Sequence, residues 1–217
     1  MKNYKGYALL SLFSTGVALA ITFMLKASVG LGPFDAVIQT LSLLSGIRIG
    51  TVSMMLNLSC VIGQLIILKK DFGFNRLLQI PLSILIGILV NYFYYNLFVS
   101  VEFNSYAISL IVFILALVLA IFSVSMVMML NLVTFPIESF CMVLSKLVPL
   151  KFAVLRQMAD ILFVVISVAL TLIFGLVPSV REGTVIGMLI FGPLMGFFIE
   201  KVHPVLTKRG IIEEIRI

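Results

Sequence analysis

Residues 106–130 read YAISLIVFILALVLAIFSVSMVMML, a run of 25 positions without a charged residue. The run is apolar on every side of a helix, whereas a membrane β-strand would alternate apolar and polar residues over about 10 positions. A helix needs about 20 apolar residues to cross the hydrocarbon layer of a bilayer. Only helices and closed barrels satisfy their backbone hydrogen bonds in lipid, so this stretch predicts a transmembrane helix.

The composition of the whole chain favours the same environment. Of 217 residues, 62% are hydrophobic and 11% are charged, whereas about a quarter of the residues of a soluble domain are charged. The sequence therefore predicts an all-α membrane protein with one polytopic domain over residues 1–217. The formal net charge of +6 comes from short basic clusters between apolar runs, which favours a lipid bilayer rather than a nucleic acid as partner. Cys60 and Cys141 lie inside apolar segments, where packing is expected rather than a disulfide or a metal site.

Six stretches are long enough to span, and two are not. The other five long stretches are Tyr7–Leu25, Ile49–Leu68, Leu77–Val99, Phe152–Leu176 and Thr184–Ile199. Pro33–Leu44 and Pro136–Leu147 are about a dozen residues each, too short to cross. We predict that these two are short helices that begin at a proline and re-enter the side from which they came.

The positions of the basic residues support this topology, because cytoplasmic loops collect Lys and Arg. If both short helices re-enter, all but three loop cations fall on one side together with both termini and the tail at 201–217. The cytoplasmic set is then Lys2, Lys5, Lys69, Lys70, Arg76, Lys146, Lys151, Lys201, Lys208, Arg209 and Arg216, and the outer set is Lys26, Arg48 and Arg181. If the short helices span instead, the asymmetry weakens. We expect six spans with both termini in the cytoplasm.

The chain also contains an internal echo. The stretch Gly32-Pro33-Phe34-Asp35 returns as Phe135-Pro136-Ile137-Glu138, a shift of 103 positions. At the same shift Arg48 meets Lys151, Val52 meets Leu155 and Asn57 meets Asp160. Halves at about 1–103 and 104–200 would each hold three spans and one short helix, and an odd number of spans makes the repeat inverted, as in many secondary transporters. A chance match between apolar sequences is the alternative.

Two acidic residues lie at the predicted starts of the short helices. Asp35 and Glu138 each follow a proline by two positions, which places the carboxylates in the first helical turn, near the positive end of the dipole. One interpretation is stabilisation of each helix start. The other is a substrate or cation site, formed where the two helix starts meet at the repeat interface.

Asp160 lies nine residues after Lys151, about 13 Å deep at 1.5 Å per residue. A carboxylate at that depth costs about 2.5 to 3.5 kcal/mol or more unless it is paired or faces water. Arg156 is four positions earlier on the same helical face and can pair with it. The pair is either structural or part of an ion site. Our candidate substrate or ion site comprises Asp35, Asn57, Glu138, Arg156 and Asp160.

Other polar and small residues have simpler interpretations. The amides Gln39, Gln64, Gln79, Asn91 and Asn131 would line a pathway or, more often in such helices, form interhelical hydrogen bonds. The last span carries two pairs of glycines spaced by four residues, Gly183 with Gly187 and Gly192 with Gly196, which suits packing within the chain or a homodimer. The sequence has no Walker pattern, no H-E-x-x-H and no G-x-S-x-G, so we expect no ATPase, no enzyme, no cofactor and no metal.

Several motifs resemble the bacterial YczE/YyaS/YitT group of small membrane proteins, which are found mainly in Gram-positive bacteria. They are GLGPFD at 30–35, GIRIGTVS at 46–53, GTVIG at 183–187 and GPL at 192–194. The chain resembles the YczE side of the group, which lacks the soluble C-terminal domain of YitT proteins, and has Phe34 where the group often has Trp. The resemblance implies a cytoplasmic-membrane location and small-molecule export, and brings no catalytic residues.

These observations lead to two functional hypotheses. The first is a secondary transporter or exporter of a small molecule, coupled to an ion through the intramembrane carboxylates. The second is a membrane scaffold or regulator that transports nothing and serves a partner enzyme. A water-accessible pocket around Asp160 would favour the carrier, and a tight, enclosed pair would favour the scaffold.

Overall fold

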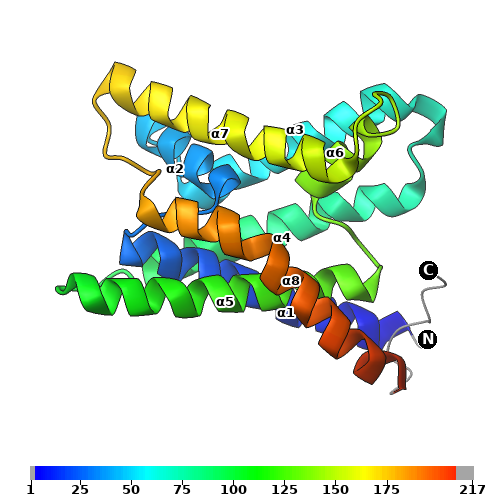
Figure 1. Cartoon of the computed structure of the whole chain (residues 1–217), viewed down its shortest axis with the longest axis horizontal. Helices are drawn as coiled ribbons and strands as arrows, with labels where there is room; N and C mark the ends of the chain where they lie inside the picture. Colours follow the sequence, from blue (N-terminus) through cyan, green and yellow to red (C-terminus); the bar gives the residue numbers. More distant parts are fainter. Residues whose placement is uncertain (1–2, 209–217) are drawn as a thin grey trace.

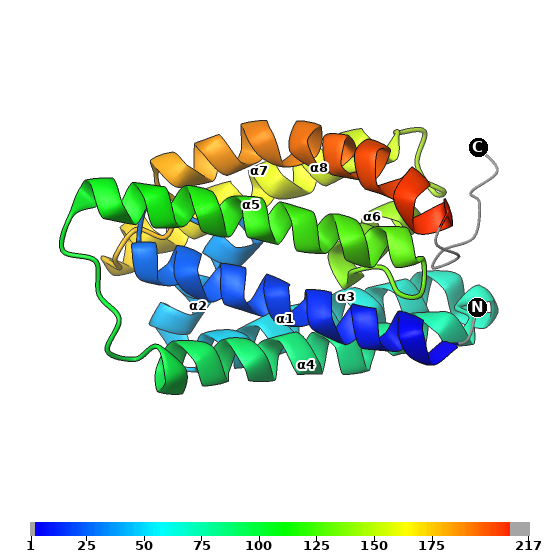
Figure 2. The ribbon, with the colours of Figure 1, turned by 90° about the horizontal axis from the view of Figure 1, so that it is seen from below.

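The computed structural model describes residues 3–208, in which there is no β-strand. Eight helices follow one another along the chain (Figures 1 and 2): α1 Asn3–Ala27, α2 Pro33–Ser45, α3 Ile49–Leu68, α4 Gln79–Tyr92, α5 Tyr106–Leu130, α6 Pro136–Leu144, α7 Phe152–Phe174 and α8 Glu182–Lys208. Short 3₁₀ turns, η1 (Lys69–Asp71) and η2 (Phe74–Leu78), link α3 to α4, and a π-helix, η3 (Phe93–Leu97), extends α4. Six helices are long and apolar enough to cross a membrane. The chain is therefore a multi-pass helical membrane protein, as predicted.

The predicted ends of the helices differ from the observed ones chiefly at the C-terminus. Helix α8 continues to Lys208, nine residues beyond the predicted end of the last span. The first part of the predicted tail, residues 201–208, is therefore helical. Residues 209–217, which include Arg209 and Arg216, lie outside the described residues, as does Lys2. Pro204 does not stop α8, although proline removes a hydrogen bond and commonly kinks a helix.

The predicted inverted repeat is present in the fold. Adding 103 to the first residues of α2, α3 and α4 gives the first residues of α6, α7 and α8, and adding it to Ala27, the end of α1, gives Leu130, the end of α5. Helix α1 runs away from the N-terminus, and α5 runs back alongside it in the opposite direction (Figure 1). The two halves therefore cross the membrane in opposite senses.

The short helices begin in the middle of the bundle. Phe34, the second residue of α2, packs against Phe163 with 5.2 Å between ring centroids, and Phe163 is midway along α7. From there α2 runs back toward the side on which α1 ended, and α6 does the same with respect to α5 (Figure 1). Proline occupies the first turn of both, where a missing N–H costs nothing because it would be unpaired anyway. Both helices are re-entrant, as the sequence predicted.

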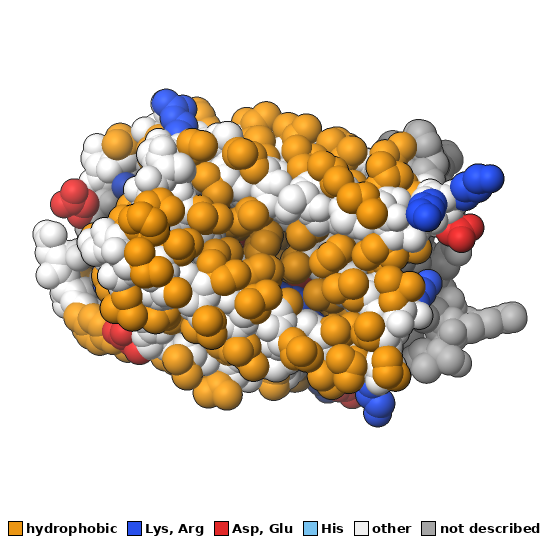
Figure 3. Space-filling model, turned by 90° about the horizontal axis from the view of Figure 1, so that it is seen from above, with side chains coloured by type: hydrophobic (Ala, Val, Ile, Leu, Met, Phe, Trp, Pro, Cys, Tyr) orange, Lys and Arg blue, Asp and Glu red, His pale blue; other side chains and the backbone are white. Residues whose placement is uncertain are grey.

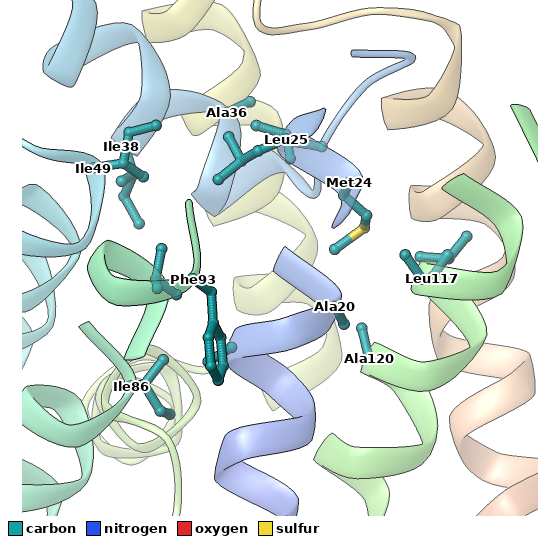
Figure 4. Packing of buried hydrophobic residues seen from close by; sticks show 14 of the residues in the cluster. Ala20, Met24, Leu25, Ala36, Ile38, Ile49, Ile86, Phe93, Leu117 and Ala120 are labelled. Atoms are coloured by element: carbon teal, nitrogen blue, oxygen red, sulfur yellow. The ribbon is translucent and has the colours of Figure 1, made fainter. Parts of the chain in front are cut away.

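The repeats meet along α1 and α5, which approach closely through small residues. A Cβ added to Gly16 would lie 2.5 Å from Ser123 Oγ, so nothing larger than glycine fits there without a shift. Ala20 and Ala120 face each other one turn farther on (Figure 4). Lipid provides little hydrophobic drive for helix association, so this close van der Waals contact holds the halves together.

Glycines also join α3 to α4. The Gly50 amide donates to Asn91 Oδ1 at 2.8 Å, and Asn91 Nδ2 donates to Thr51 Oγ1 at 3.0 Å. A Cβ on Gly87 would lie 2.5 Å from the Gly50 carbonyl oxygen. In the second repeat the equivalents of Gly50 and Gly87 are Ala153 and Ile190, and α7 and α8 make no comparable contact. Most of α7 is therefore exposed, and Ser167 is the one residue of this helix that is buried.

This close crossing predicts a stability difference between two glycines. Gly87→Ala should destabilise the protein by about 1 to 3 kcal/mol, the usual cost of overpacking. Gly196→Ala, in α8, meets nothing within 4 Å and should be neutral or slightly stabilising because alanine favours helix. Thermal unfolding of the two purified variants in detergent would measure this, and equal melting temperatures would contradict the crossing.

Candidate functional site

Three charged side chains form an ion-pair cluster between α6 and α7. Arg156 Nε lies 3.6 Å from Glu138 Oε1, and Arg156 Nη1 also pairs with Asp160 Oδ1 one turn along α7. The side chains of Arg156, Glu138 and Asp160 are 24%, 18% and 17% exposed, so they are mostly buried but keep some accessible surface. The predicted pairing of Arg156 with Asp160 is present, and Glu138 completes it from the start of α6.

Asp35 belongs to the same region but has no partner of its own. Its Oδ2 lies 3.6 Å from where a Cβ of Gly32, the N-cap residue of α2, would be. Within residues 3–208 it forms no ion pair or side-chain hydrogen bond. Its neighbour Phe34 contacts α7 seven residues beyond Arg156, about 10 Å at 1.5 Å per residue. Helix α7 thus passes the starts of both re-entrant helices.

The charges in this region do not balance. Asp35, Glu138 and Asp160 supply three carboxylates, and within residues 3–208 Arg156 is the one cation that forms an ion pair with any of them. Glu138 Oε2 is in addition buried without a hydrogen-bond partner among the described residues. Charge in the membrane interior is costly unless it is paired or hydrated. The site therefore favours uptake of a proton or another cation by a carboxylate.

Asn57 does not join this cluster. Its amide nitrogen donates to Ser53 O at 2.9 Å and to Ser53 Oγ at 3.4 Å, one turn back on α3. No hydrogen bond in the described structure links it to the other four candidates. The repeat shift maps Ser53 and Asn57 on Arg156 and Asp160. The first repeat therefore has a neutral pair where the second has an ion pair. Glu138 pairs with Arg156, but the residue equivalent to Arg156 in the repeat of Asp35 is Ser53. That shift could have identified Ser53 in the sequence.

Hydrogen bonds at equivalent positions fix the two re-entrant helices. In one repeat, Ser167 Oγ on α7 and Thr40 Oγ1 on α2 are 2.7 Å apart. In the other, the equivalent of Ser167 is Gln64 on α3, which donates to the Pro136 carbonyl oxygen at 3.2 Å. Ser139 on α6 donates to Gln64 Oε1 at 2.8 Å. Helix α2, at its middle, and helix α6, at its start, are thus each held by a long helix of the opposite repeat.

Arg76 takes part in the second of these attachments. It lies in the loop predicted to be cytoplasmic, but its Nη1 donates to Gln64 Oε1 at 2.9 Å and to Ser139 Oγ at 2.7 Å. Gln64 Nε2 donates to Gln79 Oε1 at 3.0 Å. The interhelical hydrogen bonds predicted for Gln64, Gln79 and Asn91 are therefore confirmed, and Arg76 joins them because its long side chain reaches inward.

The GLGPFD and GTVIG motifs contact each other. Gly30 has φ +149°, and a Cβ there would lie 2.5 Å from the Thr184 amide nitrogen. The Gly183 amide donates to the Val29 carbonyl oxygen at 3.0 Å, and Leu31 N donates to Thr184 Oγ1 at 3.2 Å. Only glycine fits at such an approach. The start of α8 therefore holds the loop that leads into α2.

The comparisons with known proteins give one family. Residues 4–200 match a family of unknown function, DUF6198. The chain belongs to this family. No curated protein and no solved structure matches it. Functional inference for this DUF6198 member therefore rests on the arrangement of its own residues.

The surface of this DUF6198 protein agrees with a bilayer environment. Figure 3 shows a face on which hydrophobic side chains cover the middle, with most Lys, Arg, Asp and Glu near the two ends. A small patch of basic and acidic colour is visible in a hollow near the centre of that face. No three His, Cys, Asp or Glu side chains within 3–208 are grouped to hold a metal, and both cysteines are free.

Proposed function

We propose that the protein is an ion-coupled secondary carrier, or exporter, of a small molecule in the cytoplasmic membrane of a bacterium. One observation carries the proposal: Glu138 and Asp160 pair with Arg156 on α7, whereas Asp35, at the start of the other re-entrant helix that α7 passes, has no ion pair among the described residues. A carboxylate without a salt bridge in the membrane interior can bind and release a proton or a metal cation as its surroundings change. The resemblance to YczE proteins supports export, and membership of that group is part of the proposal.

The inverted repeat supplies a route to alternating access. Transporters with such repeats expose a central site to either side by exchanging the conformations of their two halves. Here the neutral Ser53–Asn57 pair and the charged Arg156–Asp160 pair occupy equivalent positions. The exchange would change which short helix approaches the guanidinium. Asp35 would then be neutralised by Arg156 in one state and by a bound proton or cation in the other.

The alternative role, a scaffold or regulator without transport, requires that the ion pairs be purely structural. The double pairing of Arg156 with Glu138 and Asp160 would suit that role. Asp35 suits it poorly, because its place in the first turn of α2 contributes only about 0.3 to 1 kcal/mol, less than the cost of a carboxylate without an ion pair in the membrane interior. We therefore favour the carrier, and propose no enzymatic reaction.

Purified protein in vesicles loaded with a pH-sensitive dye would test the carrier. A proton gradient is imposed, and Na⁺, K⁺, choline and ethidium are added in turn as probes. We expect at least one probe to cause proton movement across the membrane of vesicles that contain the wild-type protein, and no probe to do so in empty vesicles. Infrared spectroscopy of the same protein should detect a carboxyl that gains and loses a proton as the pH is stepped. Its absence would favour the scaffold.

The proposal includes an orientation of the chain, with both termini in the cytoplasm, and this orientation can be tested separately. In a variant without Cys60 and Cys141, Lys70→Cys should react with an impermeant maleimide only after the cells are opened. Asn104→Cys, at the opposite end of the molecule, should react in intact cells. Both positions are exposed, so reactivity reports sidedness rather than burial. The reverse pattern would contradict cytoplasmic termini.

A further inference from the structure

A bowl-shaped cavity of about 440 Å³ opens at the end of the molecule opposite the N-terminus. Its walls are the end of α1, the 98–105 loop and the start of α5. Lys26 fixes one wall, because its Nζ donates to the Val99 carbonyl oxygen at 3.0 Å and lies 4.8 Å from the centroid of the Tyr94 ring. In the proposed orientation this bowl faces the outside.

A second, smaller cavity of about 30 Å³ adjoins the bowl. Leu25, Ser28 and Arg181 line both cavities. Arg181 lies across the boundary, where its Nη1 donates to the Ser28 carbonyl oxygen at 2.5 Å and its Nε to the Pro178 carbonyl oxygen at 3.1 Å. A water molecule needs about 10 to 15 Å³ by this measure, so the small cavity has room for about two.

The lining of the small cavity is polar on the inner side. Ser179 is 2% exposed and lines the cavity, yet its Oγ has no hydrogen-bond partner among the described residues. Gln39 of α2 lines it too, and its side-chain amide makes no hydrogen bond within residues 3–208. An unpaired buried hydroxyl costs about 1 to 3 kcal/mol. Water between Ser179 and Gln39 would satisfy both groups.

The cavity lies beside the loop that leads to Asp35. Gly30 and Leu31, which directly precede the start of α2, form part of its wall. Gln39 is four residues after Asp35, one turn along the same helical face. The two residues are therefore about 6 Å apart along the axis of α2.

We infer that the small cavity is a water-binding site and that it forms the outer access route for the coupling ion between the bowl and Asp35, with Ser179 and Gln39 as the water ligands. The part of this inference that concerns the coupling ion rests on the proposed function. Arg181 would limit the width of the route, because it lies where the two cavities meet. Bulk solvent would then reach α2 without a large opening.

Hydroxyl-radical labelling by X-ray radiolysis tests the water site directly, since bound water produces radicals in place. Ser179→Cys and Ser167→Cys are compared in a variant without the native cysteines. Both serines are buried, at 2% and 0% exposed, but Ser167 Oγ bonds to Thr40 and does not line the cavity. We expect the cysteine at 179 to be oxidised several-fold faster. Equal, slow oxidation of both would overturn the inference.

Two further measurements separate this inference from the carrier proposal. Gln39→Cys should be oxidised about as fast as Ser179→Cys. It replaces Ser179→Cys in the test if that variant does not fold. If wild-type vesicles move protons but Ser179→Val moves them at the same rate, the cavity is not on the route, and the inference fails while the carrier stands. If wild-type vesicles move none but the cysteine at 179 is oxidised quickly, the carrier proposal fails and the water site stands.

Discussion

Arg156→Gln should lower the free energy of unfolding by about 3 kcal/mol, the lower end of the range for a broken buried ion pair. The substitution leaves Glu138 and Asp160 facing each other without a cation in the membrane interior. The lower end applies because about a fifth of each side chain remains exposed. Unfolding of the purified protein by heat or by SDS in mixed micelles would measure the loss.

The matched control is a cation with no acidic partner. Arg48 forms no ion pair within residues 3–208, and its guanidinium carbon lies 5.5 Å from the centroid of the Tyr95 ring, so Arg48→Gln should cost less than about 1 kcal/mol. Adding Glu138→Gln and Asp160→Asn to Arg156→Gln should recover most of the lost stability, because no unpaired charge then remains. A single Arg156→Gln variant that unfolds at the wild-type temperature would show that the guanidinium does not neutralise the two acids.

The sequence was sufficient for the architecture because each span is decided locally. The length and position of each helix follow from its own residues, such as the uncharged run at 106–130 or a proline at the start of a short segment, whatever its neighbours are. The repeat could be found because Pro33 and Pro136 with their acids occur at the same shift as the later helix starts. These features depend on residue type and spacing alone, so they needed no structure.

The site was only partly predictable because it depends on which helix packs on which. In lipid all faces of a span are apolar, so periodicity does not identify partners. The pairing of Glu138 with Arg156 and the attachment of α6 to α3 arise from contacts far apart in the chain. The shift of 103 paired Asn57 with Asp160, but a sequence shift does not give the direction of a side chain, and the Asn57 amide bonds to its own helix.

Asp35→Asn should reduce proton-coupled movement of every probe to the level of empty vesicles while the protein stays folded. The amide is nearly isosteric with the carboxylate but cannot take up or release a proton. Stability should be unchanged or slightly higher, because Asp35 has no ion pair to lose and Arg156 keeps Glu138 and Asp160. The infrared band of the titrating carboxyl should disappear as well, which assigns it without reference to a transported molecule.

Glu102→Gln is the matched control for this substitution, since it removes an exposed carboxylate from the 98–105 loop and should leave both proton movement and the infrared band intact. The design separates the two roles of the site. Arg156→Gln removes a charge that forms ion pairs, so it tests stability. Asp35→Asn removes a charge that forms none among the described residues, so it tests coupling to protons. If Asp35→Asn retains full proton movement and the band, the titrating group lies elsewhere, and the unpaired acid at the start of α2 is only a helix-start residue.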